Sequence, residues 1–529
     1  MQAKSESMRE SRELFSKEMR SLPASLLVAG LFASCDALVV APSLRSMTSA
    51  RVAALRRSCG LLGAAAPGGA DDSHRWGRLA DWARTRDILF GKWDVGNVNG
   101  GLRGAIATED VREGEVLVSA PEAAVLSVRQ ADSCPLPGYF VDPGYWDSIA
   151  NKWEMRMALL LLFEKSLGGK SAWAPWLDML PNSFGLPLTF CDSELEDLQD
   201  HLFIANLRVE RAFWDDQHAA LQASMRQAPS KGELLWALSC VSSRTFTCEY
   251  GGRLPPAQIM FPVADMFNHD SGVQTGFRFE NGRYEITACR AAKGEQLLIS
   301  YGPEPNEVLL QNYGFVPTHN VHDQVGVFER ELWLVVKELH DEEESVEPRV
   351  RVLTALINGF KQAASPDSDA GAASVTAPLR ALRGVSFVTG TNSGGEAGRG
   401  YRFQVSTDGQ VEEELLVYSR ALMLNSQDFS RLGLSGILLM LSSKKAAAVS
   451  ADNEAAGRAL LELVLGYQLS PMLQLSSIED DESLLSHCTT EGDASVVEGL
   501  EGNRLMCVRY RLQRKLLLMR AIARLATGS

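Results

Sequence analysis

Four short segments of this 529-residue chain carry residue types that could do chemistry. They are GLRGAIA at 101–107, SSRTFT at 242–247, VADMFNHD at 263–270 and ISYGPEPNEVLLQNYGF at 299–315. Taken singly, each has a plain structural explanation: a glycine turn, an arginine in an ion pair, a hydrogen-bonded core histidine, and tyrosines that pack with a tethered hydroxyl. Their chemistry therefore depends on whether the fold brings the four segments together.

In this order, the four segments resemble the SET-domain methyltransferases of the rubisco large-subunit methyltransferase type. The resemblance rests on the pair Asn268-His269, on Tyr301-Gly302 and on the run Asn-Tyr-Gly-Phe at 312–315. It covers residues 90–316 and extends more loosely into a helical tail. Two features depart from the family pattern. The glycine signature is Leu-Arg-Gly-Ala, and Asp270 stands where the family usually has serine, a difference that the sequence leaves unexplained.

The resemblance implies a binding site for S-adenosylmethionine. Backbone of the Leu-Arg-Gly-Ala signature would approach the methionine part of this cofactor, where glycine permits close contact. Arg244 would pair with the cofactor's carboxylate. Asn268 and His269 would hold the cofactor largely through backbone groups, on a strand that threads a pseudoknot. The implied cofactor-binding residues are Leu102, Arg103, Gly104, Ala105, Arg244, Asn268, His269 and Tyr313.

The resemblance also makes Tyr301 the catalytic residue, beside the channel through which the methyl group passes. Tyr313 would form part of the aromatic wall around the target side chain, and Phe277 or Phe279 would complete that wall. The implied substrate-binding residues are therefore Phe277, Phe279, Tyr301 and Tyr313. A lysine must lose its proton before it attacks a methyl group, and an apolar aromatic channel disfavours its ammonium form. This chemistry requires no metal ion, and the residue spacing indicates none.

The elements expected around these segments form an α+β fold. Residues 101–121 and 284–302 each have the pattern of an apolar strand, an x-Gly-Glu turn and a second apolar strand, which predicts two hairpins of a small, irregular β domain. Between them, apolar residues recur at spacings of three and four, which predicts a helical insertion at about 143–240. Together with the resemblance, this pattern predicts a small-sheet SET fold with a pseudoknot, followed by a mostly α-helical C-terminal domain.

The predicted organisation has three parts. A targeting region occupies residues 1–70, a SET domain with its helical insertion occupies 71–316, and a helical substrate-binding domain occupies 317–529. A glycine-, serine- and alanine-rich stretch at about 365–400 is expected to form a surface loop. The last helix carries seven Arg or Lys residues, and a packed amphipathic helix with a solvated basic face is favoured over a nucleic-acid site.

The N-terminal region has the composition of a targeting sequence. Residues 19–37 contain an apolar run followed by small residues, as in a secretory signal peptide, and the run is too short to span a bilayer. Residues 38–70 are transit-like, with four arginines, four serines and no acidic residue from 42 to 70. A plastid (chloroplast) reached through the secretory pathway is therefore predicted. A plain signal peptide or a mitochondrial presequence is the alternative, and Met19 is an alternative start.

Composition narrows the classes of partner. The net charge of −14 argues against a protein that binds nucleic acid through its overall field. Nine scattered cysteines without any Cys-x-x-Cys exclude the common zinc ribbons and indicate free thiols. Beyond the N-terminal region no segment is long and apolar enough to span a membrane. The expected partner is a protein substrate bound through a lysine side chain, and the chain is expected to be a monomer.

The sequence therefore predicts an S-adenosylmethionine-dependent protein-lysine N-methyltransferase that acts on a non-histone protein. Rubisco large subunit or another plastid protein is the substrate suggested by analogy. A protein histidine is the alternative target, favoured if polar instead of aromatic groups stand beside the pocket. A catalytically silent SET-type module whose helical tail recruits a partner is the alternative of another class. The presence of Arg244, Asn268, His269 and Tyr301 counts against it.

Overall fold

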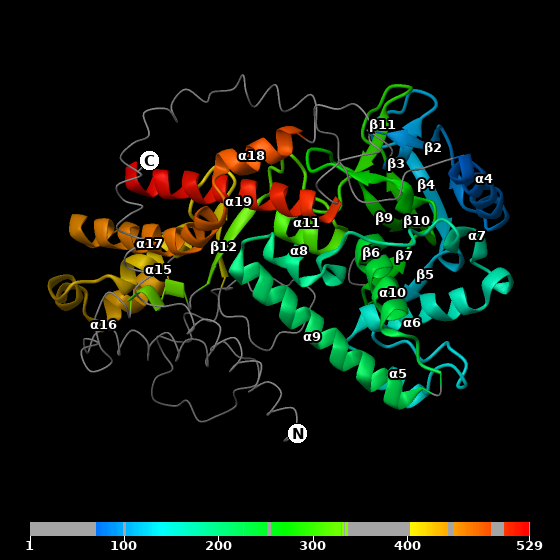
Figure 1. Ribbon diagram of the computed structural model, residues 1–529, viewed down its shortest axis with the longest axis horizontal. Coiled ribbons are helices and arrows are strands. Elements are labelled where there is room, and N and C mark those ends of the chain that lie inside the picture. Colours follow the sequence, from blue (N-terminus) through cyan, green and yellow to red (C-terminus); the bar gives the residue numbers. More distant parts are fainter. Residues whose placement is uncertain are drawn as a thin grey trace. The chain divides into compact units, whose positions relative to one another are not determined.

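The computed structural model (Figure 1) describes residues 70–98, 102–225, 227–250, 255–328, 331–332, 334–336, 402–442, 448–487 and 502–527. Residues 1–69 of the predicted targeting region and the stretch at 365–400 lie outside the described residues. The chain divides into two units. The first holds the described residues up to His322 together with Glu479–Leu512, and the second holds Asp323–Ile478 and Gln513–Ser529. Residues 479–512, placed by the sequence in the C-terminal domain, thus belong to the first unit, and the predicted domain boundaries stay predictions.

The β part of the first unit consists of three small sheets. One has the order β1-β4-β10-β9, with bounds Leu89–Phe90, Val116–Pro121, Arg283–Thr287 and Phe277–Glu280. The second has the order β2-β3-β11-β8, with bounds Trp93–Val98, Leu102–Ala107, Gln296–Ile299 and Asn268–His269. The third has the order β5-β7-β6, with bounds Leu126–Val128, Ala257–Met260 and Thr245–Cys248. In Figure 1 these strands gather in one place, with α4 (Ala70–Thr85) and α7 (Ala174–Leu177) beside them.

The two predicted hairpins are wrong in their pairing, although their turns are real. Gly114 and Gly294 take φ values of +76° and +90°, which only glycine adopts easily. The strands on either side do not pair with each other: β3 pairs with β11, and β4 pairs with β10. The two turn loops bond to each other instead, since Val111 and Ala291 exchange backbone hydrogen bonds of 2.8 and 3.1 Å. Each loop therefore carries the chain from one sheet to the next.

The predicted helical insertion is confirmed. It contains α5, α6, α7, α8, α9 and α10, with bounds Pro143–Ser148, Trp153–Ser166, Ala174–Leu177, Asp192–Glu196, His201–Ser224 and Lys231–Arg244. Helix α10 packs on α6, and it begins at a capping box: Ser230 Oγ accepts from the Glu233 N–H at 3.3 Å, and the Glu233 carboxylate accepts from the Ser230 N–H at 2.8 Å. The helix ends at Arg244, where β6 starts, so its cap and its length fix the place of that arginine.

The second unit is mostly helical, as predicted. It contains the two-stranded sheet of β12 and β13 and the helices α15, α16 and α17, with bounds Gln324–Phe328, Arg402–Ser406, Glu413–Leu422, Ser426–Ser442 and Ala451–Leu475. Two further helices, α18 and α19, have bounds Ile478–His487 and Gly502–Thr527. Residues 479–487 of α18 and 502–512 of α19 belong to the first unit, and residues 513–527 of α19 belong to the second. The predicted basic helix is α19, and Arg511 on it pairs at 2.7 Å with the fully buried Asp481 carboxylate. The helix is packed, as favoured from the sequence, but the predicted solvated basic face is wrong. Four of its seven basic residues are buried: Arg509, Arg511, Arg514 and Lys515.

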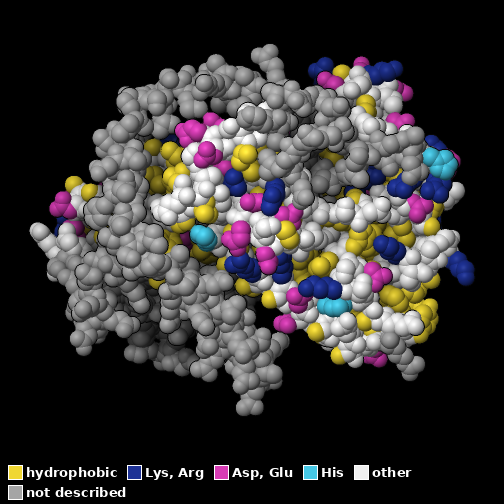
Figure 2. Space-filling model, viewed as in Figure 1, with side chains coloured by type: hydrophobic (Ala, Val, Ile, Leu, Met, Phe, Trp, Pro, Cys, Tyr) yellow, Lys and Arg dark blue, Asp and Glu magenta, His cyan; other side chains and the backbone are white. Residues whose placement is uncertain are grey.

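The described surface offers few clues to a partner. On the face seen in Figure 2, Lys and Arg side chains are interspersed with Asp and Glu. None of the described helices is long and apolar enough to cross a membrane. Within the same described ranges, no group of three or more His, Cys, Asp or Glu side chains is placed to hold a metal ion.

Candidate active site

Tyr301 follows β11 and is held at both its backbone and its hydroxyl. The hydroxyl donates to the Phe267 carbonyl at 2.7 Å, and the Tyr301 N–H donates to Nδ1 of His269 at 3.0 Å. Strand β8 pairs in parallel with β11, which places His269 opposite Ile299. The segment that carries the Asn-His pair therefore fixes Tyr301 from two directions.

His269 acts as a neutral anchor in this arrangement. Its side chain is buried, with 2% of the residue exposed, and burial lowers its pKa. Because Nδ1 accepts the Tyr301 N–H, the ring proton belongs on Nε2. This Nε2 is buried without a hydrogen-bond partner. The imidazole thus offers a fixed donor and stays neutral at neutral pH.

Tyr301 and Tyr313 come together, as the resemblance implied. Their ring centroids lie 4.8 Å apart, and the Phe315 ring lies 6.4 Å from Tyr301 and 6.2 Å from Tyr313. His269 completes the group at 5.0 Å from Tyr301. We call these four residues the Tyr301 cluster. Burial raises the pKa of Tyr301 to about 12 and raises that of Tyr313 as well, so both phenols keep their protons at neutral pH.

The end of α11 (Asn306–Tyr313) explains why Tyr313 points here. The next residue, Gly314, has a φ of +77° and ends the helix. A Cβ at this position would lie 2.7 Å from the Gly185 carbonyl oxygen. Glycine is therefore needed both for the backbone conformation and for space. Phe315, quoted in the motif but given no role from the sequence, follows directly and joins the Tyr301 cluster.

Phe277 and Phe279 lie in a different group of rings. Phe277 is 5.3 Å from Phe246 and 6.2 Å from Tyr284, while Phe279 is 5.0 Å from Tyr250 and 4.8 Å from Tyr284. We call Tyr250, Phe277, Phe279 and Tyr284 the Tyr284 cluster. The structure thus gives the place beside Tyr301 and Tyr313 to Phe315, and gives Phe277 and Phe279 other neighbours.

Arg244 is held by a carboxylate that sequence reasoning missed. Its Nη1 donates to the Asp265 carbonyl at 2.8 Å and to Asp265 Oδ2 at 3.2 Å. The Trp176 indole donates to the same Oδ2 at 3.0 Å. The Asp265 side chain has no exposed surface, and 13% of the Arg244 side chain is exposed. The sequence did offer a signal for this contact, because Asp265 is an acidic residue within an apolar segment, three positions before Asn268.

One strained turn supplies backbone acceptors to both Arg244 and Tyr301. Val263 is fully buried and has φ and ψ of +75° and −48°, the conformation of a rare, strained γ-turn. The turn that follows offers the Asp265 carbonyl to Arg244 and the Phe267 carbonyl to Tyr301. The predicted cofactor ligand and the predicted catalytic tyrosine are therefore positioned by the same five residues, 263–267.

The glycine signature on β3 contacts the Asn-His segment directly. The Asn268 side-chain amide donates to the Arg103 carbonyl at 3.0 Å, and the Arg103 guanidinium donates to the Met179 carbonyl at 2.9 Å. Leu102, Gly104 and Ala105 are buried along the same strand.

Asp270, unexplained from the sequence, now has a structural role. Its side chain accepts from the Gly272 N–H at 2.7 Å and closes the turn that follows β8.

Unsatisfied polar atoms gather around these residues. Eight buried side-chain polar atoms in the described ranges have no hydrogen-bond partner. Five of them belong to segments of this site: Arg244 Nε, Thr245 Oγ1, Asp265 Oδ1, His269 Nε2 and Gln296 Nε2. Because buried polar groups are almost always paired, this gathering of unpaired atoms calls for an explanation, and a polar ligand beside them supplies one. A molecule with a carboxylate, hydroxyls and ring nitrogens, as in S-adenosylmethionine, fits a donor set that includes a guanidinium.

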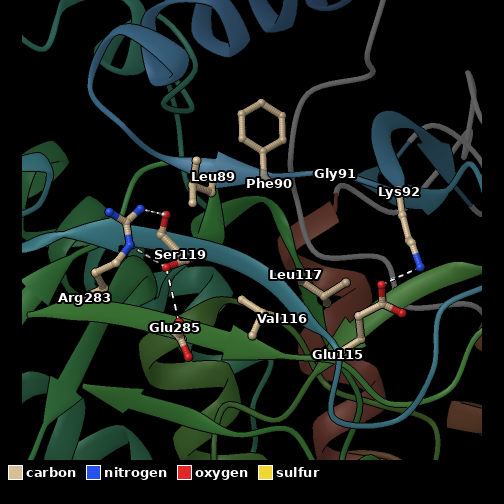
Figure 3. Close-up of a pocket in the computed structure, with 10 residues that line it drawn as sticks. All are labelled: Leu89, Phe90, Gly91, Lys92, Glu115, Val116, Leu117, Ser119, Arg283 and Glu285. Carbon is tan, nitrogen blue, oxygen red and sulfur yellow. Dashed lines mark hydrogen bonds and ion pairs between the residues drawn. The ribbon is translucent and has the colours of Figure 1, made fainter. Parts of the chain in front are cut away.

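A cavity of about 490 Å³ lies elsewhere in the first unit. Figure 3 shows Lys92 paired with Glu115 there, and Arg283 bonded to Ser119. None of the residues predicted for the site lines this cavity. Its charged side chains Lys92, Glu115 and Arg283 already have partners.

Known proteins are similar to this chain in sequence. A sequence model of the SET domain matches residues 102–302, from the start of β3 to the glycine after Tyr301. The chain is 28% identical to SET domain-containing protein 4 of Homo sapiens over 320 residues, which cover 55% of this chain and 70% of that protein. It is 27% identical to actin-histidine N-methyltransferase of Canis lupus familiaris over 264 residues, 47% of this chain and 44% of that protein. It thus spans less than half of the latter.

Solved structures give the same fold. The structure is similar to the SET domain of LSMT bound to MeLysine and AdoHcy, with a TM-score of 0.61 and 16% identity over 86% of this chain and 92% of that one. Rubisco LSMT bound to AdoMet gives a TM-score of 0.60 and 17% identity over the same shares. The predicted α+β SET fold is therefore confirmed.

Proposed function

We propose that this chain, which belongs to the SET-domain proteins, is an S-adenosylmethionine-dependent methyltransferase whose target is a protein lysine. The observation that carries the proposal is the placement of Tyr301. Its hydroxyl donates to a backbone carbonyl, and its ring packs against Tyr313 within the Tyr301 cluster. The hydroxyl oxygen keeps its lone pairs, so it can accept a hydrogen bond from an amine.

The proposed cofactor is supported by solved relatives that hold AdoMet or AdoHcy, and by the unsatisfied donors beside Arg244. Arg244 would hold the carboxylate, since its Nε remains unpaired while Asp265 fixes the other edge of the guanidinium. Asn268, His269 and the backbone of 102–105 would surround the rest. When bound, the cofactor supplies a methyl group on a positively charged sulfur.

The residues of the Tyr301 cluster favour the reactive form of lysine. Aromatic rings solvate an ammonium poorly compared with water, so the neutral amine is favoured there. Tyr301, with a pKa raised to about 12, stays protonated and orients the amine without serving as a base. The lysine nitrogen forms a bond to the methyl carbon as the bond from that carbon to sulfur breaks. The proton leaves the nitrogen for solvent, so the chain's main contribution is alignment.

A protein histidine is the second candidate target, because actin-histidine N-methyltransferases are among the similar proteins. The aromatic character of Tyr313 and Phe315 favours lysine over histidine. A silent binding module is disfavoured, since Arg244, Tyr301 and their supports are intact. The proposed substrate is a plastid protein such as the rubisco large subunit, acted on by a monomer. This rests on the transit-like composition of residues 38–70 and on analogy.

Transfer of labelled methyl groups tests the proposal. The chain is incubated with radiolabelled S-adenosylmethionine and a plastid protein extract, alongside Tyr301→Phe and the control Tyr139→Phe. Tyr139 is 77% exposed, which makes it a matched tyrosine outside the site. A protein band labelled by the wild type and by Tyr139→Phe, and faint with Tyr301→Phe, is expected. No labelled band and no cofactor binding by the wild type would contradict the proposal.

A further inference from the structure

Gln296, which neither the motif nor the resemblance assigned, lies on the strand between the two cofactor segments. Strand β11 has β3 on one side and β8 on the other. Gln296 stands opposite Ile106 on β3, and Leu298 stands opposite Asn268 on β8. Because side chains alternate along a strand, Gln296 and Asn268 share one face of the sheet with Gly104, the diagonal neighbour of Gln296.

Gly104 leaves room for both amides. A Cβ at this position would lie 2.8 Å from Asn268 Nδ2 and 2.8 Å from Gln296 Nε2. The φ of Gly104 lies outside the left-handed region, so the backbone conformation alone would accept another residue. The glycine is therefore required for space, and the two amide groups take that space.

The two amides differ in what they bind. Asn268 Nδ2 donates to the Arg103 carbonyl at 3.0 Å. Gln296 Nε2 is buried and has no partner, although the residue as a whole keeps some exposure. A buried N–H without an acceptor is unfavourable, and native proteins rarely keep one. Of the two amide donors beside Gly104, one therefore lacks an acceptor.

We propose that the Gln296 side-chain amide is a further cofactor-binding group, which donates a hydrogen bond to an acceptor atom of S-adenosylmethionine beside Gly104. This inference rests on the proposed function, since the ligand is its cofactor. The acceptor belongs to a part that S-adenosylhomocysteine also has, because a donor N–H gains nothing from a positively charged sulfur. Gln296 therefore contributes to the binding of both compounds and does not distinguish between them.

Titration calorimetry on the full chain tests this inference. Gln296→Leu removes the donor, and the dissociation constants of both compounds are expected to rise about tenfold, equivalent to about 1.4 kcal/mol. Gln258→Leu is the matched control, because Gln258 is also a half-buried strand glutamine and its Oε1 accepts from Thr247 at 2.9 Å. The control is expected to bind both compounds as the wild type does.

Gln296→Glu separates a hydrogen bond from a merely structural role, and it is the variant to use if Gln296→Leu does not fold. An ionised carboxylate has no donor, whereas a protonated one regains an O–H. Its affinity for S-adenosylhomocysteine, relative to that of the wild type, is expected to rise as pH falls from about 8 to about 5.

The outcomes separate this inference from the proposed function. Wild-type affinity in Gln296→Leu, or a pH-independent affinity ratio in Gln296→Glu, overturns the role of Gln296 alone. A wild-type chain that binds neither compound overturns the proposed function and this inference together.

Discussion

Two aromatic clusters in the first unit each contain two tyrosines and differ in how the tyrosine hydroxyls are used. In the Tyr284 cluster the hydroxyls of Tyr250 and Tyr284 bond to each other at 2.6 Å, and Arg129 donates to Tyr250 at 3.0 Å. Tyr284 is fully buried. In the Tyr301 cluster the Tyr301 hydroxyl donates to the Phe267 backbone carbonyl, and Tyr301 keeps partial exposure.

This difference separates tyrosine hydroxyls that satisfy each other from a hydroxyl that can still accept a hydrogen bond. A hydroxyl pair that satisfies itself has no capacity left for a substrate, and burial raises the pKa of Tyr284 far above its usual range. A hydroxyl that donates a hydrogen bond to a fixed carbonyl has a fixed orientation, and its lone pairs remain free to accept a hydrogen bond. The Tyr284 cluster should therefore matter for stability, and the Tyr301 cluster should matter for activity.

The largest expected effect comes from removing the Tyr301 hydroxyl. Tyr301→Phe should lower the methyl-transfer rate about 100-fold or more, as for other single groups that orient a transition state. Its free energy of unfolding should change by only about 1 kcal/mol, the usual value of one hydrogen bond. Initial rates with labelled cofactor and urea titrations measure both quantities. A variant with the wild-type rate would show that the hydroxyl has no catalytic part.

Gly104→Ala should have the next largest effect, on cofactor affinity. The new methyl group would meet both Asn268 Nδ2 and Gln296 Nε2 at 2.8 Å, so both amides must move. We expect the dissociation constant of S-adenosylhomocysteine to rise about tenfold or more, given the cost of misplaced donors. Gly232→Ala is a suitable control, because no atom lies within 4 Å of the added Cβ. Equal affinities in the two variants would refute the role of this close approach.

Tyr284→Phe should reverse the pattern of Tyr301→Phe. It leaves Tyr250 without one of its partners, and the free energy of unfolding should fall by about 1–2 kcal/mol. The methyl-transfer rate per folded molecule should stay within about twofold of the wild type, since the cost falls on folding alone. Thermal melts and rates measured well below the transition check this. A large loss of methyl-transfer rate in a fully folded Tyr284→Phe variant would show that the Tyr284 cluster also contributes to activity, which would contradict this prediction.

The smallest effect concerns the pH dependence of stability through His269. Burial lowers its pKa in the folded chain, so the unfolded chain binds the proton more readily. The contribution of His269 is fully present above the unfolded pKa of about 6.5 and is lost as pH falls below it. His269→Asn should reduce that loss between about pH 7 and about pH 5, as measured by urea unfolding at each pH. If the free energy of unfolding of His269→Asn depends on pH as that of the wild type does, another group is responsible for the loss of stability.

The sequence identified the residues that act locally and missed those that depend on long-range pairing. The helical insertion was predictable because three- and four-residue spacing is a local property of each helix. The pairing of β3 with β11 and of β4 with β10 was not, since x-Gly-Glu turns look the same whether the chain folds back or crosses to another sheet.

The same limit explains the site residues. Tyr301, Tyr313 and Arg244 were recognisable because they belong to contiguous motifs. Asp265 binds Arg244, which lies 21 positions away in the sequence. The Gln296 amide lies beside Gly104, which is about 190 positions away. The contacts of Phe277 and Phe279 could not be predicted either. Alternation along a strand tells which face of the sheet a ring occupies, but it does not tell which residues of other strands that ring contacts.

The identity of the methylated atom tests the proposed function most directly. A protein labelled by the wild-type chain can be hydrolysed to amino acids and its methylated residue identified by mass spectrometry. We predict methyllysine, produced by the wild type and by Tyr284→Phe and nearly absent with Tyr301→Phe. Methylhistidine as the sole product, or equal methyllysine from Tyr301→Phe, would contradict a lysine methyltransferase centred on Tyr301.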